Sequence, residues 1–457
     1  MKAYPKYKNS GIEWIGEIPD GWQIVKLSQM GCFTASGIDK KTIETEPLVK
    51  MINYTDIYGN ISNKLTRSRQ YMIVSCSNGK KIKHQVRRGD LIFTPSSETI
   101  VDIGLSAVVD DELLETVYSY HVLRFQFLTR TEHGYKKYLC NNDFVLNQFS
   151  KKAKGTTRQI LVRDDFNTIK VVVPPLPEQT QISNYLDHKT NLIDTLIDKK
   201  QKQIELLKEQ RTAIINQAVT KGLDPNVKMK NSGIEWLGEI PESWRKSCIR
   251  YEIMSKNLSH QDGNHGELHP IADDYVHDGI PFIMANNVTH GKLNLLDCKY
   301  IPKDLSDNLR IGFSINGDVL LTHKGTVGRV ALVDNIKTDY IMLTPQVTYY
   351  RCINKIYNKF LRYTFEAHYF QTQLEIIASK GSTRNYIGLI AQKDLFILFP
   401  PIGEQQLIVK EIEKKLSPVN QTIKGDSQQI DQLKEYRTTL ISEAVTGKID
   451  VRDEVVQ

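Results

Sequence analysis

The sequence has 457 residues, of which 40% are hydrophobic and 25% are charged, so the chain is neither disordered nor embedded in a membrane. No apolar run reaches the roughly 18 residues of a membrane-spanning helix, and the first residues lack the apolar core of a signal peptide. The formal net charge of +7 is compatible with a polyanionic partner but does not demonstrate one. We therefore expect a cytoplasmic protein with buried cores.

The chain opens with a segment that returns almost unchanged. Residues 8–22 read KNSGIEWIGEIPDGW and residues 230–244 read KNSGIEWLGEIPESW, with twelve of the fifteen positions identical. Two further segments recur in the same order, namely 154–182 at 380–408 and 206–224 at 432–450. Repeats in this order predict two half-molecules built on a common framework.

Between its lead-in and its closing segment, each half contains a body of about 150 residues. The two bodies barely resemble each other, but they share GDLIFT at 89–94 and GDVLLT at 317–322, which read as a turn followed by a short apolar strand. Strand-like runs at 121–127 and 169–174 alternate with helical runs such as 358–377. Each body is therefore expected to be a mixed α/β globule.

A basic stretch in the first body is the first candidate contact with DNA. Residues 64–88 contain eight Lys or Arg and no acidic residue, interleaved with Tyr, Ser, Asn and Gln. Such residues suit phosphate oxygens, although a solvated strand-and-turn face would look the same. The candidate DNA-binding residues in this stretch are Arg67, Arg69, Lys80, Lys81, Lys83, Arg87 and Arg88.

Two short repeats form the second candidate contact. KGTTR at 154–158 and KGSTR at 380–384 each combine two cations, two hydroxyls and a glycine, which lets the backbone approach a ligand closely. Hydroxyl groups and cations suit phosphate, and Arg can also read guanine. The alternative is a turn that recurs only because the halves share ancestry. With the Gly-rich segment 323–330, interpreted as a loop between strands, these segments give as candidates Lys154, Thr156, Thr157, Arg158, Lys324, Thr326, Arg329, Lys380, Ser382, Thr383 and Arg384.

The closing segments predict two long helices. Apolar residues in 178–220 recur at gaps of mostly three and four, and the equivalent residues of the second copy keep the same phase. At 1.5 Å per residue, a helix of this length extends about 60 Å. We expect the two to pack antiparallel as a coiled-coil spacer, the alternative being core helices of one large domain. Pro418 and Gly425 predict a kink or break in the second.

The sequence lacks the motifs of several catalytic classes. It has no G-x-x-x-x-G-K-[ST] loop, no dinucleotide fingerprint, and no Asn or Asp and Tyr around VVPPLP as an amino-methyltransferase would need. His260, His265 and His269 lie in a loop without a matching Cys or acidic partner at metal-ligand spacing, so we expect no metal site. The best nuclease-like cluster, EKK at 413–415, lies on a predicted helix. The six cysteines form no CxxC pair and indicate reduced thiols.

The lead-in SGIEWIGEIP, GDLIFT or GDVLLT, KGTTR or KGSTR, and the PPLPEQ or PPIGEQ helix occur in this order twice. In these motifs the chain resembles, over essentially its whole length, the specificity subunit of type I restriction–modification enzymes. The resemblance implies two α/β target-recognition domains, separated by two long antiparallel coiled-coil helices in a pseudo-twofold repeat. The implied domains are residues 1–173 (recognition domain 1), 174–224 (spacer helix 1), 225–399 (recognition domain 2) and 400–457 (spacer helix 2 and tail).

The same resemblance implies a function. Each recognition domain would read one half of a split, asymmetric site in double-stranded DNA, while the helices space the halves and dock two modification subunits. This chain would be non-catalytic and carry no cofactor. S-adenosylmethionine would belong to the modification subunits, and ATP with Mg²⁺ to the restriction subunits. From the residues alone, a self-sufficient enzyme, a stand-alone DNA-binding regulator and a coiled-coil scaffold without a DNA role stay open.

If the halves are equivalent, the C-terminal segment should lie beside the first lead-in, just as the end of the first helix leads into the second lead-in. The arrangement would then be effectively circular. Two equivalent halves could present like surfaces to two copies of one partner.

Overall fold

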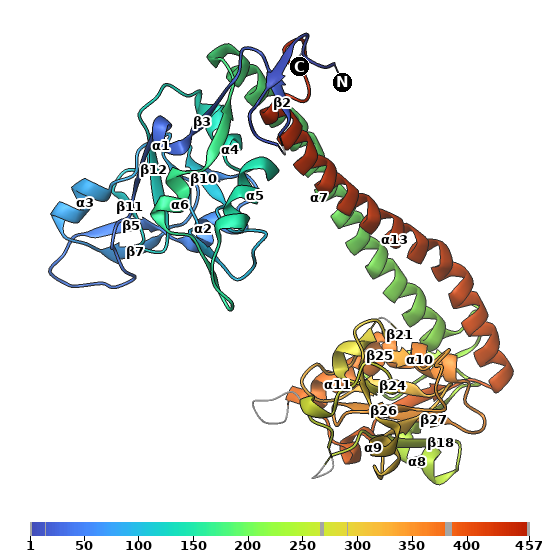
Figure 1. The fold of residues 1–457 in the computed structure, drawn as a ribbon. Helices are drawn as coiled ribbons and strands as arrows, with labels where there is room; N and C mark the ends of the chain where they lie inside the picture. Colours follow the sequence, from blue (N-terminus) through green and yellow to red (C-terminus); the bar gives the residue numbers. More distant parts are fainter. Residues whose placement is uncertain (1, 14, 266–268, 290, 380–385, 455–457) are drawn as a thin grey trace. The chain divides into compact units, whose positions relative to one another are not determined.

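The computed structural model describes residues 2–13, 15–265, 269–289, 291–379 and 386–454. The chain divides into two compact units, of which unit 1 comprises Met1–Gln201 with Gln428–Gln457 and unit 2 comprises Lys202–Ser427. Two long helices, α7 (Leu176–Lys221) and α13 (Ile402–Thr446), contribute a segment to each unit (Figure 1). Each unit therefore contains one body and parts of both helices.

The body of unit 1 is built on a sheet with the strand order β4-β12-β8-β10-β6, a second sheet β11-β5-β7 and three two-stranded ladders, β1-β2, β13-β9 and β14-β3. Its strands are β1 (Tyr7–Asn9), β2 (Glu17–Pro19), β3 (Gln23–Lys26), β4 (Gly31–Thr34), β5 (Leu48–Ile52), β6 (Lys64–Leu65), β7 (Met72–Ser75), β8 (Leu91–Phe93), β9 (Ser96–Ser97), β10 (Ser106–Val109), β11 (Thr116–Tyr118), β12 (Leu123–Phe127), β13 (Gln159–Ile160) and β14 (Lys170–Val173). Its helices are α1 (Leu27–Met30), α2 (Tyr54–Ile57), α3 (Asn78–His84), α4 (His133–Leu139), α5 (Asp143–Lys152) and α6 (Arg163–Asn167).

The body of unit 2 is built on the sheets β18-β27-β24-β25-β21-β20 and β22-β19-β26-β23, with the ladders β15-β16 and β17-β28. Its strands are β15 (Met229–Asn231), β16 (Glu239–Pro241), β17 (Arg245–Cys248), β18 (Leu258–Asp262), β19 (Ile280–Ile283), β20 (Val288–Thr289), β21 (Gly291–Leu293), β22 (Lys299–Ile301), β23 (Phe313–Ser314), β24 (Val319–Thr322), β25 (Val330–Leu332), β26 (Ile341–Leu343), β27 (Val347–Cys352) and β28 (Phe396–Phe399). Its helices are α8 (Ile249–Met254), η1 (Ala272–Asp274), η2 (Ala285–Asn287), α9 (Lys303–Asp307), α10 (Asn358–Glu366), α11 (His368–Ser379) and α12 (Leu389–Gln392).

The two bodies have the same topology although their sequences differ. The order β4-β12-β8-β10-β6 in unit 1 matches β18-β27-β24-β25-β21 in unit 2, and in both the last pair is parallel and the others antiparallel. The parallel pair β5–β11 of the second sheet likewise matches β19–β26. Residues of the two bodies can therefore be compared position by position through the strand registers.

The shared GDLIFT and GDVLLT segments form the central strands, β8 and β24. Gly89 and Gly317 have φ of +91° and +93°, a left-handed conformation that favours glycine. The carboxylates of Asp90 and Asp318 then accept backbone N–H groups of the preceding turn at 2.9 Å and 2.8 Å. This turn delivers the chain into a strand whose residues are all buried, which explains why the segment recurs.

The two long helices form as predicted, with one correction. The expected break at Pro418 and Gly425 does not occur, because α13 continues through both residues. Leu416 and Val419, on either side of the proline, are both buried. We infer that this packing offsets the roughly 3 kcal/mol that an interior proline costs. The helical run expected at 358–377 is divided, because Ala367 is extended and separates α10 from α11.

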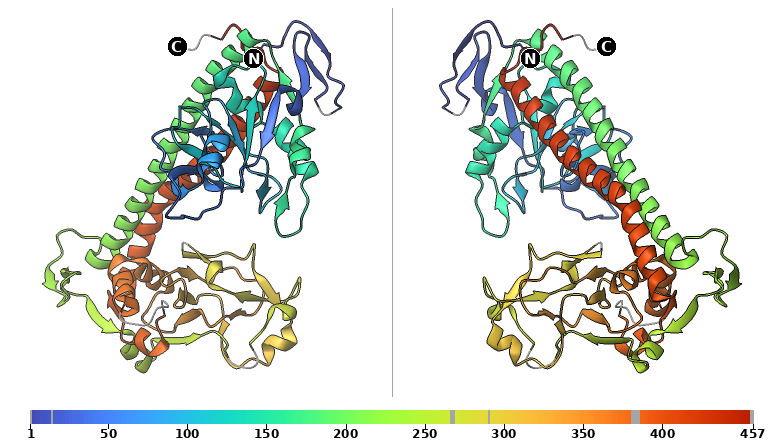
Figure 2. Two further views of the ribbon diagram at one scale, coloured as in Figure 1. Left: turned by 90° about the vertical axis from the view of Figure 1, so that its left-hand side faces the viewer. Right: turned by 90° about the vertical axis from the view of Figure 1, so that its right-hand side faces the viewer.

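Within each unit, a segment of α7 and a segment of α13 lie side by side and antiparallel (Figures 1 and 2). In unit 1, Ile182, Leu186 and Ile193 of α7 share one apolar core with Leu440 and Ala444 of α13 and with the body. In unit 2, the other ends of the two helices share a core with the second body in the same way. The predicted fold, two α/β domains with long antiparallel coiled-coil helices and a pseudo-twofold repeat, is confirmed.

The repeated lead-in holds each body against a helix. Trp22 and Trp244 are fully buried, and their indole N–H groups donate to Glu178 on α7 and to Glu404 on α13, each at 2.9 Å. These glutamates belong to the repeated PPxxEQ segments at the two helix starts. The lead-in therefore recurs because each unit needs the same tryptophan anchor.

The C-terminal segment lies beside the first lead-in, as predicted. The Tyr7 hydroxyl donates to the Gly447 carbonyl at 3.1 Å, and the Asp450 N–H donates to the Lys2 carbonyl at 2.9 Å (Figure 1). Gly447 has φ of +74° and Gly222, which follows α7 in unit 2, has φ of +76°. The two helices therefore end in the same turn, each next to a lead-in.

Candidate nucleic-acid interface

The segment KGTTR forms the turn of a short hairpin in unit 1. Lys154 and Ile160 exchange both backbone hydrogen bonds, at 3.1 Å and 2.8 Å, so the turn encloses the repeat. Gly155 has φ of +127°, and a β-carbon there would lie 2.1 Å from the Arg158 carbonyl oxygen. The glycine is therefore required by this turn. The strand after it, β13, pairs with β9, which follows the central strand β8.

Unit 2 repeats this arrangement as far as it is described. Lys380, Ser382, Thr383 and Arg384 of KGSTR lie outside the described residues. Tyr386, just beyond them, forms a bridge with Lys324, and the Ile387 N–H donates to the His323 carbonyl at 2.9 Å. In unit 1, the Leu161 N–H donates to the Pro95 carbonyl at 2.8 Å in the same manner. The chain that follows each KG(T/S)TR repeat thus lies against the end of the central strand.

The Gly-rich segment 323–330 is a loop between β24 and β25, as expected. Lys324 and Thr326 are exposed on it, next to the bridge with Tyr386. Arg329, at the other end of the loop, instead lines a hollow with Arg211 of α7 and Glu366 of α10. The structure therefore places Lys324, and not Arg329, beside Tyr386, which follows the second repeat in the sequence.

The basic stretch 64–88 acquires acidic neighbours in the folded chain. Six of its cations bond to side chains or carbonyls elsewhere in unit 1, four of them in the acidic segment 110–115. These contacts are Lys64 to Asp110 at 3.0 Å, Arg69 to Asp56 at 2.8 Å, Lys80 to the Gly37 carbonyl at 3.3 Å, Lys81 to Glu115 at 2.5 Å, Arg67 to the Glu112 carbonyl at 3.0 Å and Arg88 to the Asp110 carbonyl at 2.9 Å. An acid-free run in the sequence is therefore not an acid-free surface. DNA binding by these residues stays a prediction.

The basic stretch and the KGTTR turn lie at opposite edges of the main sheet. Arg67 and Arg88 contact the segment that follows the carboxyl end of β10, whereas KGTTR adjoins the segment that follows the carboxyl end of β8. Because β8 and β10 are antiparallel, these two ends face opposite ways. Lys80 and Lys83 are exposed on α3 and Arg87 is exposed just after it. The predicted residues of unit 1 thus occupy separate parts of the body.

Around the KGTTR turn the charges are mixed. Burial, with the nearby cations Lys40 and Arg158, lowers the pKa of His121, so its imidazole is neutral at pH 7. Burial acts to raise the pKa of Asp102, but hydrogen bonds from Ser97, Thr99 and Tyr58 bring it below its ordinary value. The surface around the KGTTR turn therefore carries a neutral histidine close to cations, and a carboxylate that accepts hydrogen bonds from neighbouring hydroxyl groups.

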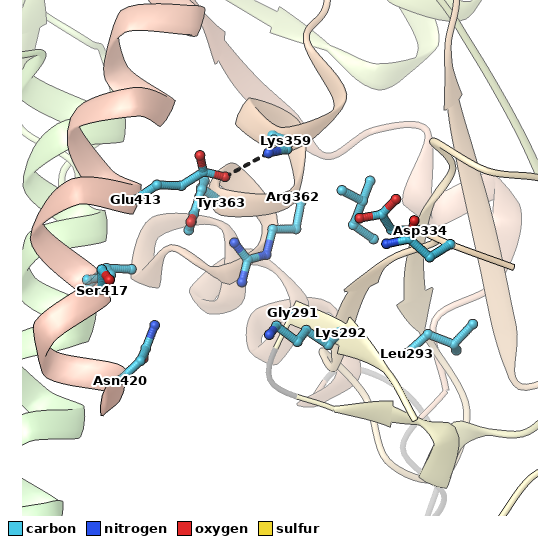
Figure 3. A pocket seen from close by; sticks show the side chains of 13 residues that line it. Gly291, Lys292, Leu293, Asp334, Lys359, Arg362, Tyr363, Glu413, Ser417 and Asn420 are labelled. Atoms are coloured by element: carbon cyan, nitrogen blue, oxygen red, sulfur yellow. Dashed lines mark hydrogen bonds and ion pairs between the residues drawn. The ribbon is translucent and has the colours of Figure 1, made fainter. Parts of the chain in front are cut away.

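A polar cavity lies at the junction of body and helices in unit 2 (Figure 3). It has a volume of about 420 Å³ and is lined by α13, α10, β21 and the residues after β25. Glu413 of α13 pairs with Lys359 of α10 at 3.0 Å. Arg362 pairs with Glu366 at 3.0 Å and stacks over Tyr363 at 4.0 Å from the ring centroid.

The same junction in unit 1 carries the same kinds of residue. The two bodies can be aligned on the shared central strand and then outward through the strand pairs next to it. In this alignment Lys64 is equivalent to Lys292, and Asp110 to Asp334. In unit 1, Lys64 pairs with Asp110 at 3.0 Å. Lys137 of α4, equivalent to Arg362, pairs with Asp187 of α7 at 2.7 Å. This junction was not predicted from the sequence. Its only signal in the sequence is that residues of like type recur in the two halves at a nearly constant offset.

A repeated arginine also belongs to each junction. Arg211 in EQRT and Arg437 in EYRT occupy equivalent positions on α7 and α13. Arg211 bonds to Glu366 of the second body at 2.9 Å, and Arg437 bonds to Asp194 at 2.9 Å and to the Ile61 carbonyl of the first body at 3.3 Å. Each arginine therefore connects a long helix to a body, through different partners.

Across the described ranges, no group of three or more His, Cys, Asp or Glu side chains is placed to hold a metal ion. Among the helices in those ranges, none combines the length and apolarity needed to cross a membrane.

Comparison with known proteins gives a consistent result. A family described as type I restriction modification DNA specificity domain matches residues 19–206 and 268–435. A putative type I restriction enzyme MjaX specificity subunit from Methanocaldococcus jannaschii is 24% identical over 461 residues, covering 99% of both chains. The MjaVIII specificity subunit from the same organism is 24% identical over 306 residues, covering 66% of this chain and 67% of its own.

Among solved structures, a chain from a study of complex assembly and conformational transition of the type I R-M system has a similar fold. Its TM-score is 0.66 at 16% identity, over 94% of this chain and 99% of its own. The two matched segments of the family cover most of this sequence, and each lies mainly in one unit. The chain therefore belongs to the type I restriction–modification DNA specificity family, the non-catalytic component that recognises the DNA sequence.

Proposed function

We propose that the two bodies are target-recognition domains that each read one half of a split, asymmetric site in double-stranded DNA. The observation that carries this proposal is the contrast between the bodies. They share strand order, strand direction and register, yet their sequences differ almost everywhere outside the frame. One scaffold with two sets of side chains suits two different half-sites on one DNA molecule.

The long helices would set the distance between the half-sites. Each body is fixed to a helix by a buried tryptophan that donates to a glutamate at 2.9 Å, and by a repeated arginine that bonds to Glu366 in unit 2 and to the Ile61 carbonyl in unit 1. DNA-binding proteins with paired reading elements accept only certain separations, because the elements must meet the groove at matching faces. A helical spacer with domains anchored in this way is suited to fixing the separation.

We further propose that the helices and the junctions dock two modification subunits, one for each half. Two like surfaces on one chain can bind two copies of one partner. The junctions keep residues of like type, Lys64 with Lys292 and Asp110 with Asp334, where the bodies otherwise diverge. S-adenosylmethionine would be bound by the modification subunits, and ATP with Mg²⁺ by restriction subunits that join the complex.

The experiment is to sequence the methylated bases of DNA from cells that express this chain with its modification subunit. We expect one asymmetric motif made of two short specific parts separated by a fixed gap. Replacing residues 1–173 by the equivalent domain of another specificity subunit should change one part only. A continuous motif from an assembled complex would contradict the split-site proposal. Methylation by the chain without its partner would favour a self-sufficient enzyme instead.

A further inference from the structure

One loop has the same backbone in both bodies. It joins β11 to β12 in unit 1 and β26 to β27 in unit 2. The Ser119 N–H donates to a carbonyl at the end of β5 at 2.9 Å, and the Thr344 N–H donates to a carbonyl at the end of β19 at 3.0 Å. In the turn that follows, a backbone N–H donates to the Ser119 carbonyl at 3.3 Å in unit 1 and to the Thr344 carbonyl at 3.1 Å in unit 2. His121 and Gln346, two residues further on, therefore occupy one structural position.

This position adjoins the segment that follows each KG(T/S)TR repeat. In unit 2, the His323 N–H donates to the Gln346 carbonyl at 2.9 Å, and the His323 carbonyl accepts from Ile387. In unit 1, burial lowers the pKa of the His121 imidazole, and the charges of Lys40 and of Arg158 in KGTTR act in the same direction. A side chain here would lie next to any phosphate held by the repeat.

The side chains at this edge change between the units while the backbone does not. Besides His121 and Gln346, the equivalent pairs that differ in chemistry are Ser96 and Lys324, Tyr120 and Pro345, and Asn53 and Met284. At the opposite edge, the junction keeps Lys64 with Lys292 and Asp110 with Asp334. Two domains that must accept different sequences need to differ where they meet the bases, and at this edge the side chains differ on a shared backbone frame.

In unit 2 the position opens onto a hollow of about 290 Å³. Gln346 and Lys324 line it together with Thr344 and the aromatic rings of Tyr275 and Phe282. The Thr344 hydroxyl, 5% exposed as a residue, has no hydrogen-bond partner among the described residues. In unit 1 the equivalent Ser119 hydroxyl donates to Asn53 at 3.2 Å, a partner that Met284 replaces. The hollow thus offers an unused hydroxyl, an amide and a cation, and the described residues lining it include no carboxylate.

We propose that His121 and Gln346 are the residues through which the two domains read a base in their respective half-sites. This inference rests on the proposed function. The glutamine amide presents a donor and an acceptor side by side, which match N6 and N7 of adenine in the major groove. A neutral histidine presents one ring N–H and one ring nitrogen, which pair with single donors or acceptors on a base edge. In unit 1, the KGTTR repeat would hold the adjacent phosphate.

The test uses the complex of the full chain with its modification subunit and the variants His121→Gln and Gln346→His. Binding is measured by competition, with the recognised duplex against a panel in which each specific base pair is changed in turn. The matched control is Gln126→His, half-exposed at the other end of strand β12. For each substitution we expect discrimination at one base pair to fall by about 10- to 100-fold. The change should lie in the half-site of that domain, and the control should leave every position unchanged.

Two results would overturn the inference. One is unchanged discrimination at every base pair in both variants. The other is an equal loss at all positions of both half-sites, which would indicate a structural effect on the whole complex. The unmodified half-site serves as the internal control for folding. Failure of the proposed function looks different, because the unsubstituted complex would then show no split pattern of discrimination.

Discussion

Arg211 gives the sharpest test of how a body is held on a helix. Its guanidinium bonds to Glu366 of α10 at 2.9 Å, and the same carboxylate pairs with Arg362 at 3.0 Å. The side chains of Arg211 and Glu366 are only 20% and 11% exposed. Replacing Arg211 by methionine keeps most of the apolar stem but leaves this carboxylate with one cation instead of two.

The expected cost lies between two limits. Breaking a buried ion pair costs about 3–5 kcal/mol, whereas an exposed pair contributes less than about 1 kcal/mol. Because Arg362 remains and both groups retain some access to water, we expect about 2–3 kcal/mol for Arg211→Met. A loss of about 2 kcal/mol corresponds to an opening equilibrium about 30-fold more favourable.

Native-state hydrogen exchange measures this change locally, because it reports the opening of individual segments rather than of the whole chain. Amides of α10 should exchange about 30-fold faster in Arg211→Met. Arg437→Met, the equivalent change in unit 1, should leave α10 unaffected. Lys303→Met removes an exposed pair with Asp307, whose side chains are 61% and 47% exposed, and should cost less than about 0.5 kcal/mol. Unchanged exchange of α10 in Arg211→Met, or the same change in Lys303→Met, would refute the reasoning.

Three further predictions follow from single observations. Gly155→Ala should open the KGTTR turn, because its β-carbon would lie 2.1 Å from a carbonyl oxygen. Binding to one half-site should weaken while the thermal unfolding temperature changes little. Unaltered binding would contradict this. A circular permutant that begins at Val227 and joins the original ends through a short linker should fold and direct methylation to the same motif. The reason is that the Asp450 N–H already bonds to the Lys2 carbonyl at 2.9 Å. Loss of the methylated motif would show that recognition depends on the original ends. Glu252→Gln should lower the free energy of unfolding by about 1.5–3 kcal/mol at pH 7, because the carboxylate accepts from Ser247, Asn257 and Arg245. Burial acts to raise the Glu252 pKa, but these bonds bring it below its ordinary value. The stabilisation is therefore present above the pKa that Glu252 has in the unfolded chain, and it is lost as the pH falls through the pKa of the folded protein. Urea titrations that show equal acid sensitivity in the unsubstituted protein and in Glu252→Gln would contradict this.

Much of the fold could be predicted because the chain contains it twice. The repeated lead-in, the GDLIFT and GDVLLT strands and the helix periodicity are local patterns, and local patterns depend on residues near in sequence. The predicted position of the C-terminal segment followed from the repeat alone, and contacts of Tyr7 and Asp450 confirm it. The break at Pro418 was wrong because a local propensity was overridden by packing on both sides of the proline.

The candidate interface was less predictable, since charges act through space. Residues 64–88 contain no acid, yet the fold places Asp110 to Glu115 against several of their cations. The equivalence of His121 and Gln346 was also hidden, because the two bodies can be aligned there only through strand pairing.

The sequence by itself determined that the protein has two similar halves, that long apolar-striped helices close them, and that the chain resembles a known family of DNA-specificity subunits. Each of these rests on repetition and periodicity, which a linear sequence carries in full. Only the tertiary structure decided which cations are paired, which edge of the first body carries the KGTTR turn, and which residues share one position in the two domains. Those properties depend on contacts between segments that lie far apart in the chain. Strand pairing decides which segments become neighbours, and the turn at the end of a strand decides which side chain is exposed there.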